Sequence, residues 1–169
     1  MIYLLDVNAL LAMHYQEHVH YARVDAWATL LRTEREQGAI VFATCPITEL
    51  GFVRIASGKS GHSPCVDSAR ADLHTLKSRQ KMLFIPDDIP ARRLPAWVRK
   101  WAQTTDGYLL ALAKAHGGHL ATLDRFIPGA LLIPDETAAP LMVREEGVLS
   151  DWSVPPLSTG SQPDTAMWR

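Results

Sequence analysis

Four acidic side chains, far apart along the sequence, share one kind of position in the predicted elements. Asp6 and Asp124 each follow directly on an apolar, strand-like run, and Glu49 and Asp106 lie in the first turns of predicted helices. In an open parallel sheet, ligands bind in the crevice at the carboxyl ends of the strands. We therefore expect the four carboxylates to meet in one pocket.

Carboxylates that crowd together repel one another, and some take up protons unless a cation neutralises them. A purely oxygen ligand set selects a hard divalent ion, so the sequence predicts Mg²⁺, with Mn²⁺ as a plausible substitute. Such a site orients a water, lowers its pKa and stabilises the leaving oxygen in an in-line attack on a phosphodiester.

Each acidic residue also has an ordinary structural explanation. Asp and Glu are common in first helical turns because they complement the helix dipole, and Asp is common where strands end in turns. Taken one at a time, the four residues favour that explanation. The expected convergence, with no obvious Lys or Arg among them, is what favours a functional site.

The elements that position these residues are predicted from apolar periodicity. Continuous apolar runs are typical of strands covered on both faces, and stretches with three- and four-residue apolar spacing are typical of helices. Strands that alternate with helices predict an α/β fold with a central parallel sheet flanked by helices on both faces. The predicted strands are 2–5, 39–43, 82–85, 120–123 and 130–133, and the predicted helices are 21–37, 46–57, 65–81 and a fourth from Thr104 or Thr105 to Gly117.

The chain is predicted to form one domain over residues 1–150, followed by a tail, 151–169, whose proline- and serine-containing composition is typical of a flexible segment. The region 86–101 is interrupted by three prolines and has a basic bias, so we predict a loop and a short helix. Trp97 and Trp101 in this region are expected to pack in a core or interface, with stacking on nucleic-acid bases as the alternative.

Bulk composition limits the class of protein. The chain has 169 residues, a hydrophobic fraction of 47% and a formal net charge of -1, so it lacks the excess positive charge that marks many nucleic-acid binders. Two cysteines are too few for a disulfide scaffold, and no apolar run approaches the roughly 20 residues of a membrane span. We expect a cytoplasmic protein without a membrane segment.

Four segments of the chain resemble, in order, the sequence motifs of PIN-domain ribonucleases. The first has an Asp, one spacer and an Asn after the first strand, the second supplies a Glu, and the third and fourth each supply an Asp. Together they extend over residues 1 to about 134. The segments are Leu4-Leu5-Asp6-Val7-Asn8-Ala9-Leu10-Leu11, Thr48-Glu49-Leu50-Gly51-Phe52-Val53-Arg54, Thr104-Thr105-Asp106-Gly107-Tyr108-Leu109-Leu110-Ala111-Leu112-Ala113 and Leu120-Ala121-Thr122-Leu123-Asp124-Arg125-Phe126.

Within that family, the chain is most similar to the VapC-type toxins of type II toxin-antitoxin systems. The resemblance implies a three-layer PIN-like domain and a Mg²⁺-dependent endoribonuclease that a cognate antitoxin protein inhibits. It implies that Asp6 and Asp106 are the principal metal ligands and that Glu49 and Asp124 complete the acidic group directly or through water. Asn8 and Thr105 would orient these ligands by hydrogen bonds.

The remaining expectations concern RNA contacts and assembly. A nuclease needs positive charge around an acidic centre, and the candidates for RNA phosphate contacts, with a solvated surface as the alternative, are Arg54, Arg92, Arg93, Arg99 and Lys100. An apolar face on the helix predicted at 46–57 or at 65–81 is a candidate for a symmetric homodimer.

Two other functions remain open from the sequence. A Mg²⁺-dependent phosphatase-like domain also places acidic residues at strand ends, although Asn8 occupies the position where such domains usually have a second Asp. A non-catalytic PIN module that binds RNA or protein would need no metal at these positions.

Overall fold

The computed structural model describes residues 1–33 and 40–135 of the chain. The described residues belong to one compact unit. The predicted boundary at residue 150 and the predicted tail, 151–169, lie outside the described residues, as do the carboxyl end of the helix predicted at 21–37 and the first residue of the strand predicted at 39–43.

Strands and helices alternate along the described chain, as the apolar runs predicted. The elements are β1 (Ile2–Leu5), α1 (Val7–His14), α2 (Tyr21–Thr33), β2 (Val41–Thr44), α3 (Pro46–Ala56), α4 (Val66–Gln80), β3 (Leu83–Phe84), the 3-10 turns η2 (Ala91–Arg93) and η3 (Trp101–Gln103), α5 (Thr104–Ala115), β4 (His119–Thr122) and β5 (Leu131–Leu132). Helix α1 was not predicted from the sequence.

All five strands are parallel and lie in the order β3-β2-β1-β4-β5. Strand β1 is central, and the chain leaves it first toward β2 and β3 and later toward β4 and β5. This reversal of direction is a topological switch point, where ligands bind in open α/β sheets. The carboxyl ends of β1 and β4 are adjacent there, because Leu5 pairs with Ala121.

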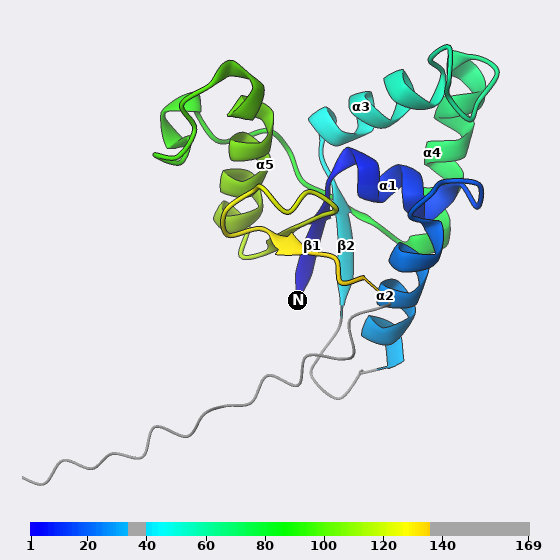
Figure 1. Cartoon of the computed structure of the whole chain (residues 1–169), viewed down its shortest axis with the longest axis horizontal. Helices are drawn as coiled ribbons and strands as arrows, with labels where there is room; N and C mark the ends of the chain where they lie inside the picture. The colour runs from blue at the N-terminus through cyan, green and yellow to red at the C-terminus, as the bar shows by residue number, and fades with distance from the viewer. Residues whose placement is uncertain (34–39, 136–169) are drawn as a thin grey trace, which may run out of the picture. The chain divides into compact units, whose positions relative to one another are not determined.

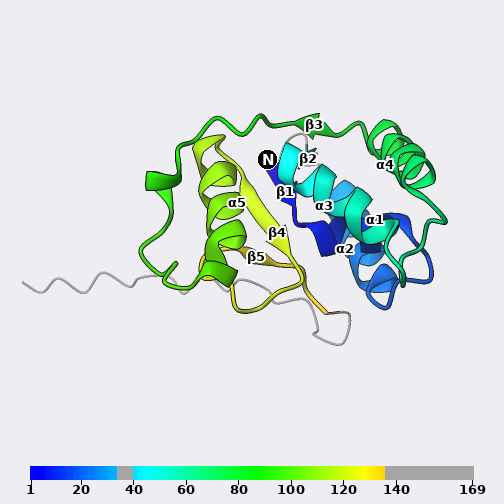
Figure 2. The same ribbon diagram turned by 90° about the horizontal axis from the view of Figure 1, so that it is seen from above.

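Helices cover both faces of the sheet (Figures 1 and 2). Successive side chains of β1 point to opposite faces, so Tyr3 and Leu5 pack toward α1 and α2, whereas Leu4 packs toward α5. The two hydrophobic clusters confirm the predicted three-layer α/β architecture and explain why the strands read as continuous apolar runs.

Helix α5 lies against the segment that precedes it, and Gly107 permits this contact. A Cβ atom at Gly107 would be 2.3 Å from Val98 Cγ2, so only glycine fits without a shift of one partner. This close approach explains why glycine, a poor helix former, directly follows Asp106 in the first turns of α5. Helix α5 begins at Thr104, as predicted, and Gln103 is its N-cap.

No helix within residues 1–33 and 40–135 is long and apolar enough to span a membrane.

Candidate active site

Asp6 lies at the switch point because β1 ends at Leu5 and α1 begins at Val7. It is the N-cap of α1, and its Oδ1 accepts a hydrogen bond of 2.6 Å from the Val7 backbone N–H. Its Oδ2 accepts a second bond of 3.0 Å from the hydroxyl of Thr122, the last residue of β4. The carboxylate is thereby fixed between the two central strands.

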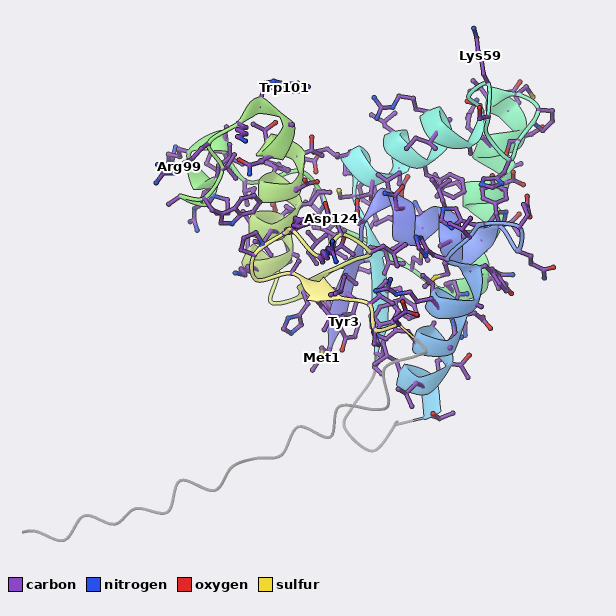
Figure 3. The ribbon with its side chains drawn as sticks, viewed as in Figure 1. Met1, Tyr3, Lys59, Arg99, Trp101 and Asp124 are labelled. Carbon is purple, nitrogen blue, oxygen red and sulfur yellow. The ribbon has the colours of Figure 1, made fainter. Side chains whose placement is uncertain are left out.

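Asp124 follows β4 and is linked to Asp6 through the same hydroxyl. The Asp124 backbone N–H donates to Thr122 Oγ1 at 3.0 Å, and Asp124 Oδ1 accepts from the Phe126 backbone N–H at 2.8 Å. Figure 3 shows Asp124 in the loop that follows β4. Thr122 is fully buried and bonds to both aspartates, yet the sequence pattern predicted no role for it.

Asp106 comes from the first turn of α5 and joins the same group electrostatically. Partial burial raises the pKa of Asp106, and the negative charges of Asp6 and Asp124 raise it further. Burial is also the main cause that raises the pKa of Asp6, with a smaller contribution from Asp124, while the bonds from Thr122 and Val7 oppose the shift. The structure therefore brings three of the four predicted carboxylates together.

None of the three aspartates forms an ion pair within the described part of the chain. The same residues include no group of three or more His, Cys, Asp or Glu side chains arranged closely enough to enclose a metal ion. The aspartates thus form an open, negatively charged group of oxygen ligands without a cationic partner.

Glu49 has partners of its own. It lies in the first turn of α3, and its Oε1 accepts a 2.6 Å hydrogen bond from Thr44 and a hydrogen bond from the ammonium group of Lys77 on α4. Both bonds go to one oxygen. Glu49 is not among the charges that raise the pKa of Asp6 or Asp106, so the structure does not bring it into the aspartate group.

The other predicted site residues form no hydrogen bond or ion pair with the aspartates within the described residues. Asn8, in the first turn of α1, and Thr105, in that of α5, are exposed, and their side chains have no hydrogen-bond partner in the same part of the chain. Arg54 on α3, and Arg92 and Arg93 in η2, are exposed as well. Their roles stay predictions.

A second feature is an open groove of about 680 Å³ between α3 and α4. Its walls are mainly apolar and include Leu50, Val53 and Val66, and Glu49 and Lys77 also line it. The exposed fractions of Leu50 and Val66 are 72% and 54%. Within residues 1–33 and 40–135, the groove therefore presents an exposed apolar face on the two helices where the sequence predicted a dimer interface.

The parallel sheet with helices on both faces, together with the carboxylates at its switch point, defines a PIN-like α/β domain. No protein-family model matches the chain. It is similar to ribonucleases of Mycobacterium tuberculosis. It is 37% identical over 129 residues to ribonuclease VapC39, covering 72% of this chain and 87% of that protein, and 35% identical over 143 residues to ribonuclease VapC29, covering 81% and 100%. The chain belongs to the VapC ribonuclease family.

A solved structure confirms the fold independently of close sequence similarity. It is the crystal structure of VapBC2 from Rickettsia felis bound to a DNA fragment from the VapBC2 promoter. The two chains superpose with a TM-score of 0.52 at 17% sequence identity, and the match covers 78% of this chain and 97% of the other.

Proposed function

We propose that this protein is a metal-dependent endoribonuclease and the toxin of a type II toxin-antitoxin system. The observation that carries the proposal is the group of Asp6, Asp106 and Asp124, which lacks a cationic partner among the described residues and whose burial and mutual repulsion raise the pKa of Asp106. Membership of a family whose members are named ribonucleases supports RNA as the substrate.

The donor set fits Mg²⁺, with Mn²⁺ as a substitute. Mg²⁺ prefers oxygen ligands and usually takes only one or two carboxylates while it retains several waters, so an aspartate group too open to enclose an ion is compatible with it. When bound, the ion would supply an activated water and charge stabilisation at a phosphodiester.

Different residues of the chain would then bind the ion and position its ligands. Asp6 and Asp106 would hold the ion directly, and Asp124 would hold it through water. The Thr122 hydroxyl links the Asp6 carboxylate, to which it donates, to the Asp124 backbone N–H, from which it accepts. Glu49 Oε2, which accepts neither of the two bonds made by Oε1, would contact the group through water.

The remaining predicted roles belong to the same proposal. Asn8 and Thr105 would orient the ligands, and Arg54, Arg92 and Arg93 would contact RNA phosphates. A cognate antitoxin would bind and inhibit the enzyme in the cytoplasm, and the VapBC2 complex, a structure of similar fold, supports a partner of this kind. The apolar face of α3 and α4 would form a homodimer.

The experiment compares RNA cleavage by the parent with cleavage by Asp106→Asn in Mg²⁺ buffer, with and without a chelator. Asp25→Asn, an exposed residue on α2, is the matched control. We expect cleavage by the parent and the control, none by Asp106→Asn, and none after chelation.

The alternatives give different results. Equal RNA binding without cleavage by any variant would indicate a non-catalytic module. Covalent phosphate trapped on Asp6 would indicate a phosphatase-like domain. Full cleavage by Asp106→Asn, with contaminating nuclease excluded, would overturn the assignment of the site.

A further inference from the structure

Trp101 occupies an unusual position for a tryptophan. It opens the 3-10 turn η3, which runs directly into α5, and its exposed fraction is 89%. By contrast, Trp27 is buried and Trp97 packs against a hydrophobic cluster. Trp97 therefore packs in the core, as one part of the expectation had it, whereas Trp101 does not, and its place in an interface stays a prediction.

The indole is exposed, but its backbone is well held. Gln103 Oε1 accepts hydrogen bonds from the backbone N–H groups of Arg99 at 3.0 Å and Lys100 at 3.1 Å. The Thr104 hydroxyl donates to the Trp101 carbonyl at 2.7 Å. A rigid side chain on an ordered turn loses little conformational entropy when it binds a ligand.

The turn lies next to the aspartate group. Asp106 is five positions after Trp101, about 8–10 Å along η3 and the start of α5 at roughly 1.5–2 Å per residue. Figure 3 shows Trp101 beyond the amino-terminal end of α5 and Lys59 at the distant tip between α3 and α4. A single strand whose scissile phosphate lies at Asp106 can therefore reach the indole within a nucleotide or two.

The charge around Trp101 suits a polyanion. Arg92, Arg93, Arg99 and Lys100 are exposed, and none of the four forms an ion pair within the part of the chain that the structure describes. In a protein of net charge -1, this is a local positive region beside a negative site. Proteins that bind single-stranded nucleic acid combine such a region with exposed aromatic rings.

We propose that Trp101 stacks on a base of the single-stranded RNA next to the scissile phosphate, and that Arg99 and Lys100 contact the adjacent phosphates. This assignment rests on the proposed ribonuclease function and adds a substrate-positioning element to it. Because every base has a π-face, stacking fixes the position of the strand and confers little sequence preference.

The test measures binding of a labelled single-stranded RNA oligonucleotide of mixed sequence by fluorescence anisotropy. The full chain carries Asp106→Asn so that the RNA stays intact. In this background, Trp101→Ala should weaken binding by about 5-fold to 150-fold, and Trp101→Phe should retain most of the affinity. Lys59→Ala, the matched exposed control, should change nothing.

A second readout isolates the interactions with phosphate. The double variant Arg99→Ala/Lys100→Ala should reduce the slope of log affinity against log salt by roughly 0.7 for each phosphate that the two side chains neutralise, whereas Trp101→Ala should leave that slope unchanged.

Two results would overturn the inference while leaving the proposed function intact. One is that the parent cleaves RNA but Trp101→Ala binds RNA as tightly as the protein with Trp101 intact. The other is a Trp101→Ala variant that loses affinity for a cognate antitoxin alone, which would assign the indole to a protein contact. Failure of the parent to cleave RNA that it still binds through Trp101 would instead overturn the proposed function alone.

Discussion

Asp106 bears an electrostatic cost in the candidate site that no hydrogen bond among the described residues offsets. Its partial burial and two nearby negative charges raise its pKa, and its carboxylate accepts no hydrogen bond among the described residues. Asp6, by comparison, receives two hydrogen bonds that favour its ionised form. A group that costs stability and has no structural partner is typical of a functional site.

Asp106→Asn should therefore stabilise the metal-free protein. A carboxyl group whose pKa is higher in the folded than in the unfolded chain favours unfolding as the pH rises above its ordinary value of 3.8, and the cost is complete above the raised pKa. The melting temperature of Asp106→Asn should exceed that of the parent at pH 7, and the difference should vanish in acid. Asp25→Asn should show no such difference, and a lower melting temperature for Asp106→Asn at pH 7 would contradict the prediction.

Glu49 should contribute less to cleavage than Asp106 does, because its Oε1 is held by Thr44 and Lys77. We expect Glu49→Gln to lower RNA cleavage by about 10-fold to 100-fold, the range for groups that act on a metal site through another group. Steady-state cleavage rates at saturating Mg²⁺ would measure this.

Lys77→Met is the matched variant, since it leaves Glu49 in place and removes only its cation. It should lower the free energy of unfolding by about 1–2 kcal/mol, the usual loss for a partly buried, charge-assisted hydrogen bond.

The prediction for Glu49 has its own contrary outcome. Loss of cleavage in Glu49→Gln as complete as in Asp106→Asn would place Glu49 among the direct ligands.

At the residue scale, strand ends and first turns located the three clustered aspartates from the sequence. The partners of these residues were not predictable in the same way. Thr122 bonds to Asp6 across 116 residues, and Lys77 reaches Glu49 across 28, so both contacts depend on which elements become neighbours. The only available signal for Thr122 was a polar residue in an otherwise apolar run beside Asp124.

At the element scale, the position of α5 depends on Gly107. An added Cβ would meet Val98 Cγ2 at 2.3 Å, so Gly107→Ala should push α5 away from the segment before it. Overpacking of this kind costs about 1–3 kcal/mol and outweighs the gain in helix propensity of up to about 1 kcal/mol. Denaturant unfolding should show a net loss of stability, and RNA cleavage should fall because Asp106 moves with the helix.

Removal of the Val98 side-chain methyl groups supplies the control. The double variant Gly107→Ala/Val98→Ala should lose less unfolding free energy than the two single variants lose in total, because the added Cβ then has space. Purely additive losses would show that the contact does not position α5.

Helix α1 shows where periodicity fails. Its residues Ala9 to Met13 are all buried, so the middle of the helix has no polar face and its apolar run carries no period of 3.6. By contrast, β1 has its predicted bounds, and β4 and the helices α3, α4 and α5 differ from theirs by one or two residues. The very short β3 and β5, each of two residues, were predicted longer because apolar runs continue beyond the hydrogen-bonded pairs.

At the scale of the whole molecule, the apolar face of α3 and α4 should hold two copies together. Val66→Glu introduces a charge at the first residue of α4, where an acidic side chain suits the helix dipole and leaves the fold intact. We expect the parent to sediment as a dimer and Val66→Glu as a monomer. Val19→Glu, at a residue with an exposed fraction of 88% in the segment between α1 and α2, should remain dimeric, and a monomeric parent at tens of micromolar would contradict the prediction.

Metal binding should stabilise the whole fold, because an ion that binds only the folded chain shifts unfolding by mass action. Mg²⁺ or Mn²⁺ should raise the melting temperature of the parent at pH 7 and leave that of Asp106→Asn nearly unchanged.

The metal-induced rise should also depend on pH. The ion must displace protons from Asp6 and Asp106, whose pKa values are both raised, so protons compete more strongly as the pH falls toward those values. The metal-induced rise should therefore shrink in mild acid, as thermal unfolding across a pH series would measure. An equal rise in Asp106→Asn, or one that does not change with pH, would mean that the ion binds elsewhere than at these aspartates.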